Sequence, residues 1–184
     1  MSLGYKDFDG KYSISQSYAY DYVFYNMTNL TSAENLVLPA TTLADYCYRC
    51  MFYGCTSLTK ASELPATTLA SYCYYEMFSG CTRLTQAPQC IPATTLANYC
   101  YRSMFSGCTG LTQAPELPAT TLANYCYSNM FSGCTSLTQA PELPATTLAD
   151  SCYQYMFYNC TGLTEAPATL PATTLANYCY YYMF

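Results

Sequence analysis

Cysteine has the most reactive side chain in this chain, and the spacing of the cysteines decides which chemistry is open to them. The sequence has 13 cysteines and no histidine. Free cysteine is among the most buried residue types, so a regular spacing favours a role in the core. Two columns recur once per repeat, and we expect both to be buried: Cys47, Cys73, Cys100, Cys126, Cys152 and Cys179, then Cys55, Cys81, Cys108, Cys134 and Cys160.

Three other roles for the thiols are disfavoured. Cys126 and Cys134 would lie about 12 Å apart along a helix, which is too far for a disulfide. Cys47 and Cys50 form a Cys-x-x-Cys pair, but no second pair or histidine completes a zinc shell. A thiolate nucleophile needs a neighbouring base or cation. We therefore predict no metal, no cofactor and no catalytic cysteine, and expect Cys50 and Cys90, which lie outside both columns, to be the accessible thiols.

The acidic residues do not form an enzymatic site either. Glu63, Glu116 and Glu142 recur near prolines, as in solvated loops, without an acid and base pair. The sequence has no glycine-rich phosphate loop and no nucleophile elbow, so we predict that the protein is not an enzyme. Charged residues make up 9% of the chain and the net charge is -5, which excludes a basic stripe for nucleic acid. No apolar run approaches the roughly 20 residues of a membrane span.

A repeated hexapeptide shows how the chain must position these side chains. Pro-Ala-Thr-Thr-Leu-Ala occurs six times at intervals of 26 or 27 residues, which is typical of repeats that stack on one another. Within a repeat, apolar residues three and four apart over 122–131 predict a short amphipathic helix. A column of glycine or asparagine follows, and predicts a left-handed residue that ends the helix: Gly54, Gly80, Gly107, Gly133, Asn26 and Asn159.

The remaining part of each repeat predicts one short strand. Extended segments such as 137–140 end at prolines, and identical strands in successive repeats must run parallel. We therefore expect an α/β repeat solenoid, leucine-rich-repeat-like, with one short parallel strand and one short helix per 26–27 residue repeat. Residues 1–184 should form a single domain with 1–23 as a degenerate N-terminal cap. The last repeat stops midway at Phe184, which predicts a truncated array or end-to-end self-association through the uncapped C-terminal repeat.

The run Met-Phe-x-Gly-Cys-Thr-x-Leu begins at Met51, Met77, Met104 and Met130. It resembles the BspA-like leucine-rich repeats and the related 26-residue repeats of bacterial surface proteins, and the resemblance extends from about Tyr18 to Phe184. It implies a curved solenoid at the bacterial cell surface or secreted, with adhesion to protein or glycan ligands on host or other cells. Residues 1–16 lack the hydrophobic stretch of a secretory signal.

Two columns of residues are candidates for binding a ligand. Polar side chains on the predicted strand would line the concave face, or form a solvated ladder of amides: Lys60, Gln86, Gln113, Gln139 and Glu165. The least regular positions of the predicted helix include Tyr75, Arg102 and Tyr155, where variation reflects either ligand contact or drift. The two regular tyrosine columns, which begin at Tyr46 and Tyr48, are expected to be half-buried with their hydroxyls in solvent.

These features predict a non-enzymatic adhesion or ligand-binding module. The alternative is a structural spacer or self-assembling fibre unit with no specific ligand. A binding module should present a contiguous, exposed cluster that interrupts the repeat on one face. A spacer should present faces that repeat without interruption.

Overall fold

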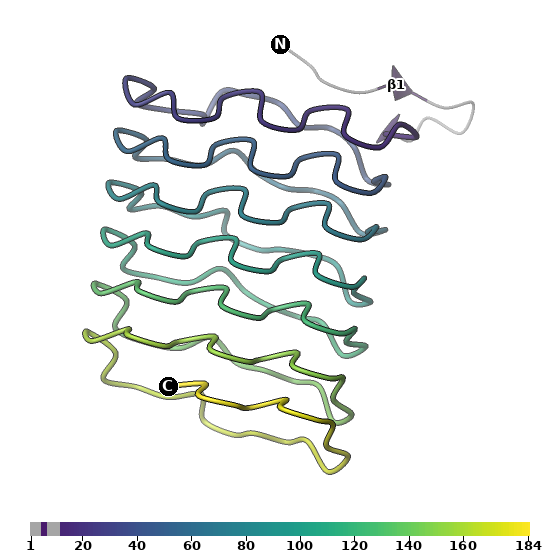
Figure 1. The fold of residues 1–184 in the computed structure, drawn as a ribbon, viewed down its shortest axis with the longest axis vertical. Coiled ribbons are helices and arrows are strands. Elements are labelled where there is room, and N and C mark those ends of the chain that lie inside the picture. The colour runs from purple at the N-terminus through teal and green to yellow at the C-terminus, as the bar shows by residue number, and fades with distance from the viewer. Residues whose placement is uncertain (1–4, 7–11) are drawn as a thin grey trace.

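The computed structural model describes residues 5–6 and 12–184, which form a stack of coils. Each repeat contributes one coil, and successive coils lie directly on one another from the purple to the yellow end of the chain (Figure 1). The strands are β1 (Tyr5–Lys6) and β2 (Tyr12–Ser13), which pair antiparallel. Of the predicted cap over 1–23, residues 1–4 and 7–11 lie outside the described part. Residues 12–23 are part of the first coil and bond to the next one, for example from the Tyr20 N–H to the Cys47 carbonyl at 2.8 Å.

The predicted helix is wrong, because the described residues contain no helix. In residues 44–58 and their equivalents, here called the turn run, alternate amides bond in different directions. The Arg49 N–H donates to the Tyr46 carbonyl three residues earlier (3.2 Å), whereas the Tyr48 N–H donates to the Cys73 carbonyl of the next coil (2.9 Å). An α-helix would use both amides for bonds to residues four positions earlier. The turn run therefore uses every second amide to join neighbouring coils.

Positive φ recurs at every fourth residue of the turn run. Tyr46, Cys50 and Gly54 have φ of 58°, 51° and 69°. Each is the third residue of a four-residue turn closed by an N–H to carbonyl bond, and type II turns require positive φ at this position. The predicted left-handed glycine or asparagine column is confirmed, with φ of 55° at Asn26 and 59° at Asn159. The column is the last of three such positions in the run, and it does not end a helix.

Gly133→Val is expected to lower the free energy of unfolding by about 1–3 kcal/mol, because a β-branched residue is strained at positive φ. Space is not the cause, since a Cβ at Gly133 would lie 3.7 Å from the Gly107 Cα. The φ of 74° is the cause. Gly133→Asn is the control, because asparagine already occupies this column at Asn26 and Asn159. Equal urea midpoints for the two variants would contradict this explanation.

The other half of each coil, residues 59–69 and their equivalents, is here called the extended run. Isolated parallel bridges join the extended runs of neighbouring coils, such as Lys60 to Gln86 and Gln139 to Glu165. The parallel direction agrees with the prediction, but each bridge is a single residue, so the predicted strand per repeat is wrong. Prolines such as Pro88 explain the interruption, since proline has no N–H to donate to a ladder.

The core lies between the two runs and consists of repeated columns. Phenylalanine rings stack from coil to coil, with the centroids of Phe78 and Phe105 5.6 Å apart and those of Phe105 and Phe131 5.7 Å apart. Both predicted cysteine columns are buried. The second column also donates hydrogen bonds, for example from Cys108 Sγ to the Phe78 carbonyl at 3.1 Å. The columns therefore join the coils through side chains as well as through the main chain.

Two predictions about exposure need correction. Cys50 is only 2% exposed and its thiol lies 3.7 Å from Glu76 Oε2, so it is not an accessible thiol, whereas Cys90 is partly exposed. The tyrosine column that begins at Tyr48 is fully buried as far as Tyr153, and the hydroxyls of these five residues have no hydrogen-bond partner among the described residues. The column that begins at Tyr46 is half-buried, as predicted, as far as Tyr125. Tyr48 belongs to the buried core together with Phe52, which follows it by four residues, the period of the turn run.

Candidate binding surfaces

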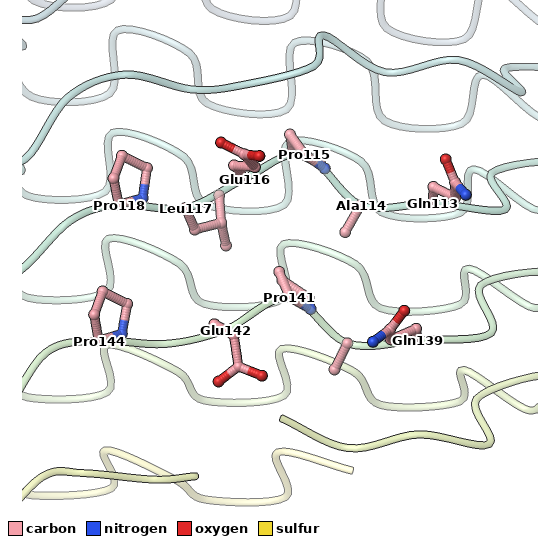
Figure 2. A pocket seen from close by; sticks show the side chains of 11 residues that line it. Gln113, Ala114, Pro115, Glu116, Leu117, Pro118, Gln139, Pro141, Glu142 and Pro144 are labelled. Atoms are coloured by element: carbon pink, nitrogen blue, oxygen red, sulfur yellow. The ribbon is translucent and has the colours of Figure 1, made fainter. Parts of the chain in front are cut away.

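A cleft of about 630 Å³ opens on the side of the stack formed by the extended runs, here called the extended face. It lies between residues 113–118 and 139–144 of neighbouring coils, and we call it the extended-face cleft (Figure 2). The two coils have the same sequence here, Leu-Thr-Gln-Ala-Pro-Glu-Leu-Pro, at 111–118 and 137–144. Identical runs would be expected to pair in register, so the opening has a local cause.

That cause is a missing set of main-chain hydrogen bonds. In an equivalent pair of coils, the Thr59 carbonyl accepts from Thr85 N–H at 3.1 Å, and Ala61 N–H donates to the Gln86 carbonyl at 3.1 Å. In the described structure, no main-chain hydrogen bond joins 111–123 to 137–149. The groups that would make these bonds, including the Ala114 N–H and the Gln139 N–H and carbonyl, are therefore without main-chain partners at the cleft.

The extra residue of a 27-residue repeat accounts for part of this change. One repeat before the cleft, the bridge joins Cys90 to Glu116, where the regular pattern would join Gln86 to Gln113. The Glu116 N–H donates to the Gln89 carbonyl at 3.0 Å. The insertion near Cys90 thus shifts the contact of the next coil three residues along the extended run, away from Gln113.

The interior of the cleft is mainly apolar. Leu117 and Pro141 border it, and the exposed amides of Gln113 and Gln139 lie at one end (Figure 2). The carboxyl groups of Glu116 and Glu142 lie on opposite outer sides of the two runs, pointing away from each other. Glu142 Oε1 accepts a hydrogen bond from the Ala168 N–H at 3.0 Å. This geometry does not form an acid and base pair around a shared substrate.

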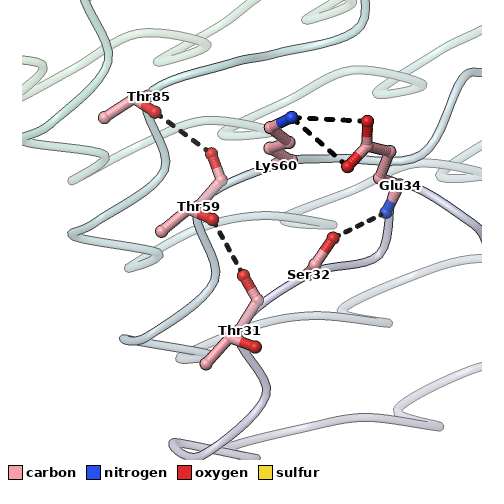
Figure 3. A network of polar contacts seen from close by, with 6 residues as sticks. All are labelled: Thr31, Ser32, Glu34, Thr59, Lys60 and Thr85. Atoms are coloured by element: carbon pink, nitrogen blue, oxygen red, sulfur yellow. Dashed lines mark hydrogen bonds and ion pairs between the residues drawn. The ribbon is translucent and has the colours of Figure 1, made fainter.

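The remaining residues of the predicted strand column lie outside the cleft. Lys60 Nζ lies 3.3 Å from Glu34 Oε2 and is paired with it (Figure 3). Beside them, threonine hydroxyls donate to carbonyls of the preceding coil, from Thr59 to Thr31 at 2.9 Å and from Thr85 to Thr59 at 3.3 Å. The ladder in this region is therefore built from threonine hydroxyls. Gln86 is bridged to Lys60, and Glu165 is bridged to Gln139.

A second surface lies on the side of the stack formed by the turn runs, here called the turn face. Rings of the outer tyrosine column stack with centroids 4.5–4.8 Å apart from Tyr18 through Tyr46, Tyr72 and Tyr99 to Tyr125. Offset stacking at such distances stabilises aromatic pairs. Ser151 occupies the next position of the column, so the stack ends at Tyr125. We call this stack and the arginines beside it the tyrosine–arginine face.

Arg49 on this face has a carboxylate partner. Its Nε and Nη2 donate to the two carboxylate oxygens of Asp21 at 3.0 and 2.6 Å, in the bidentate geometry that suits a guanidinium. The rings of Tyr18, Tyr22 and Tyr46 lie 5.0–5.4 Å from the guanidinium carbon, within cation–π range. Donating these hydrogen bonds to Asp21 raises the pKa of Arg49, against the lowering effect of burial.

Arg102 has similar neighbours without the carboxylate. The rings of Tyr75, Tyr99 and Tyr125 lie 5.8–6.0 Å from its guanidinium carbon. No ion pair or hydrogen bond to the Arg102 side chain exists among the described residues, and its Nε is buried without a partner. Burial raises the pKa of Tyr75 to about 12, with a further contribution from Glu76, so its hydroxyl stays protonated at neutral pH.

The structure thus brings together two of the three predicted turn-face residues. Tyr75 and Arg102 are neighbours, whereas Tyr155 belongs to a separate cluster, stacked on Tyr182 at 5.6 Å. The sequence analysis missed Tyr99 and Tyr125 as neighbours of Arg102, because both belong to a regular column. Tyr75 and Tyr125 each lie about one repeat length from Arg102 in the sequence, and this separation could have placed them in the adjacent coils.

Comparison with known families identifies the repeat. The family model for the BspA type leucine rich repeat region matches residues 13–114 and 98–183, with six copies. The chain belongs to this family. The resemblance in its Met-Phe-x-Gly-Cys-Thr-x-Leu runs is therefore confirmed, and the BspA type leucine rich repeat supports a module for protein interaction that is generally non-enzymatic. Comparison with curated proteins and with solved structures gives no significant match.

Two further properties of this BspA type repeat protein concern the residues that the structure describes. None of its elements there is a helix long and apolar enough to cross a membrane. In the same part of the chain, no three His, Cys, Asp or Glu side chains gather in a way that could hold a metal ion. The extended-face cleft presents amides, carboxyl groups and main-chain groups, and the tyrosine–arginine face presents aromatic rings and guanidinium groups.

Proposed function

We propose that this chain is an adhesion module, displayed on or secreted from a bacterial cell, that binds a partner protein through the extended-face cleft. Family membership supports a protein-interaction module. The observation that carries the proposal is the interruption of main-chain bonding between 111–123 and 137–149. A spacer would repeat its faces, whereas here two identical sequences are separated by a cleft.

The chemistry of the cleft suits an extended protein segment. Its volume of about 630 Å³ lies within the range typical of ligand sites. Main-chain groups without partners, such as the Ala114 N–H and the Gln139 carbonyl, can pair with the main chain of a bound segment. Leu117 and Pro141 offer apolar contact to its side chains, and the exposed Gln113 and Gln139 amides add hydrogen bonds.

A blocking variant tests this assignment. Peptides selected from a random phage library on the wild-type protein should lose at least about tenfold in affinity for the double variant Gln113→Trp, Gln139→Trp, because the indoles fill the cleft. Gln86→Trp is the matched control, since Gln86 is exposed in the same column outside the cleft and should leave affinity unchanged. Isothermal titration calorimetry measures the affinity of the selected peptides for all three proteins.

Two results would contradict the proposal. One is equal affinity of the selected peptides for the wild-type protein and the double variant. The other is binding on a glycan array with no peptide selected from the library, which would indicate a glycan ligand in place of a protein. Melting temperatures of the variants show that each has folded before its affinity is interpreted.

A further inference from the structure

The two arginines of the tyrosine–arginine face form a natural comparison. Each guanidinium lies near three tyrosine rings, at 5.0–5.4 Å for Arg49 and 5.8–6.0 Å for Arg102. Arg49 also binds the Asp21 carboxylate through two hydrogen bonds. The corresponding position one coil before Arg102 is Tyr75, which cannot supply a carboxylate. Arg102 therefore differs from Arg49 chiefly in the missing anion.

The nearby groups of the chain do not replace that anion. Glu76 is the neighbouring acid, but its Oε2 contacts the Cys50 thiol at 3.7 Å, and it forms no ion pair with Arg102 in the described structure. In the next coil, Ser128 uses its hydroxyl to donate to Asn129 Oδ1 at 3.0 Å. The Arg102 Nε, although buried, has no hydrogen-bond partner within the described residues. A buried donor without a partner is energetically unfavourable, and a ligand oxygen would relieve this cost.

We infer that Arg102, with Tyr75, Tyr99 and Tyr125, is a binding site for a carboxylate on an acidic segment of a partner protein. A guanidinium presents a planar pair of donors that matches a carboxylate, and the Arg49 to Asp21 contact shows this match on the same face. Tyrosine and arginine are also the residue types that contribute most to protein interfaces. The site lies on the turn face, so it does not depend on the extended-face cleft.

The decisive experiment exchanges the environments of the two arginines. Tyr75→Asp should give Arg102 an internal carboxylate and abolish binding, whereas Asp21→Asn should free Arg49 and create a second site. Arg102→Gln removes the site, and Arg102→Lys keeps the charge without the paired donors. The probe is the peptide acetyl-Gly-Glu-Gly-Glu-Gly-amide, with its Gln-for-Glu analogue as the control, titrated into ¹⁵N-labelled protein at low salt.

The arginine Nε–H signals in the NMR spectrum report binding at each site. We expect the Glu peptide, and not the Gln peptide, to shift the Arg102 signal in the wild-type protein. Affinity, measured in these two variants from the main-chain amide signals beside the site, should fall at least about tenfold in Arg102→Gln and Tyr75→Asp, as expected for loss of charge-assisted hydrogen bonds. In Asp21→Asn, the Arg49 signal should begin to respond to the Glu peptide.

Three outcomes would overturn the inference. The first is an equal response to the Glu and Gln peptides, and the second is unchanged binding by Tyr75→Asp. The third is a response to an oligogalacturonate without a response to the Glu peptide, which would indicate an acidic glycan. If Arg102→Gln does not fold, the comparison of Tyr75→Asp with the wild-type protein decides. Loss of this site with peptide binding retained at the extended-face cleft would leave the proposed function intact.

Discussion

Raising the pH from 8 to about 11 is expected to unfold this protein. Burial raises the pKa of Cys47, Cys50 and Cys81 to about 12, from an ordinary value of 9.0. Burial likewise raises the pKa of the fully buried Tyr74 and Tyr101 well above the ordinary range. The native state can keep these groups inside only while they are protonated, because burying their anions is costly.

The direction of the effect follows from proton linkage. A thiol whose pKa is higher in the folded state keeps its proton after the unfolded chain has lost its own. Its contribution to stability is complete below about pH 9 and is lost progressively between pH 9 and 12. For each such thiol, the free energy of unfolding falls by about 1.4 kcal/mol per pH unit in this window. The free energy of unfolding therefore falls by about 8 kcal/mol by pH 11 from Cys47, Cys50 and Cys81 alone, which is comparable with the whole stability of a typical domain.

Urea titrations followed by circular dichroism between pH 7 and 11 measure this dependence. The free energy of unfolding should be nearly constant up to about pH 8.5 and should then fall steeply. Cys81→Ala is the control, since it removes one titrating thiol and should reduce the slope by about one proton. A free energy of unfolding that stays constant to pH 11 would show that these thiols are not held protonated in the core.

The repeat period, the parallel stacking and both cysteine columns could be predicted from the sequence. The helix could not be distinguished from the turn run, because the two have similar periods. Core residues of the turn run recur every four residues, as at Cys47, Met51 and Cys55. Over about ten residues a period of four resembles the 3.6-residue period of a helix. The strict repetition of four is the feature that favours consecutive turns.

Positive φ at tyrosine was beyond prediction for a different reason. The sequence analysis found the left-handed column that begins at Gly54, since glycine and asparagine are typical of such positions. Tyr46 and Tyr72, with φ of 58°, carry no such signal. Their rings stack at 4.7 Å across the coils, and this stacking offsets part of the backbone strain. The strain and its compensation involve residues 26 positions apart.

The candidate sites depended even more on contacts between repeats. The exposed column containing Gln113 and Gln139 followed from the period, but the cleft did not, since it depends on pairing that shifts at Cys90 in the preceding coil. Similarly, Tyr75 and Arg102 could be selected as irregular positions. Their difference from Asp21 and Arg49 became clear only from the hydrogen bonds across coils. Aligning charged residues one repeat apart would have found the Asp21 to Arg49 pair.

Phe105→Ala is expected to lower the free energy of unfolding by about 3–5 kcal/mol, the usual cost of removing a buried phenylalanine ring. Phe105 is fully buried between the rings of Phe78 and Phe131, at 5.6 and 5.7 Å. Because each repeat contacts only its neighbours, a cavity in a central coil should also weaken the coupling between the two ends of the stack. Urea unfolding should therefore become broader as well as shift to a lower midpoint.

The same column provides the matched control. Phe184 is 54% exposed, and its ring stacks on Phe157 at 5.5 Å. Phe184→Ala should cost less than about 1.5 kcal/mol, because little of its ring is removed from water. Equal losses for Phe105→Ala and Phe184→Ala would contradict a stability that arises from ring stacking between coils. A sharp single transition in Phe105→Ala would instead show that coupling extends beyond nearest neighbours.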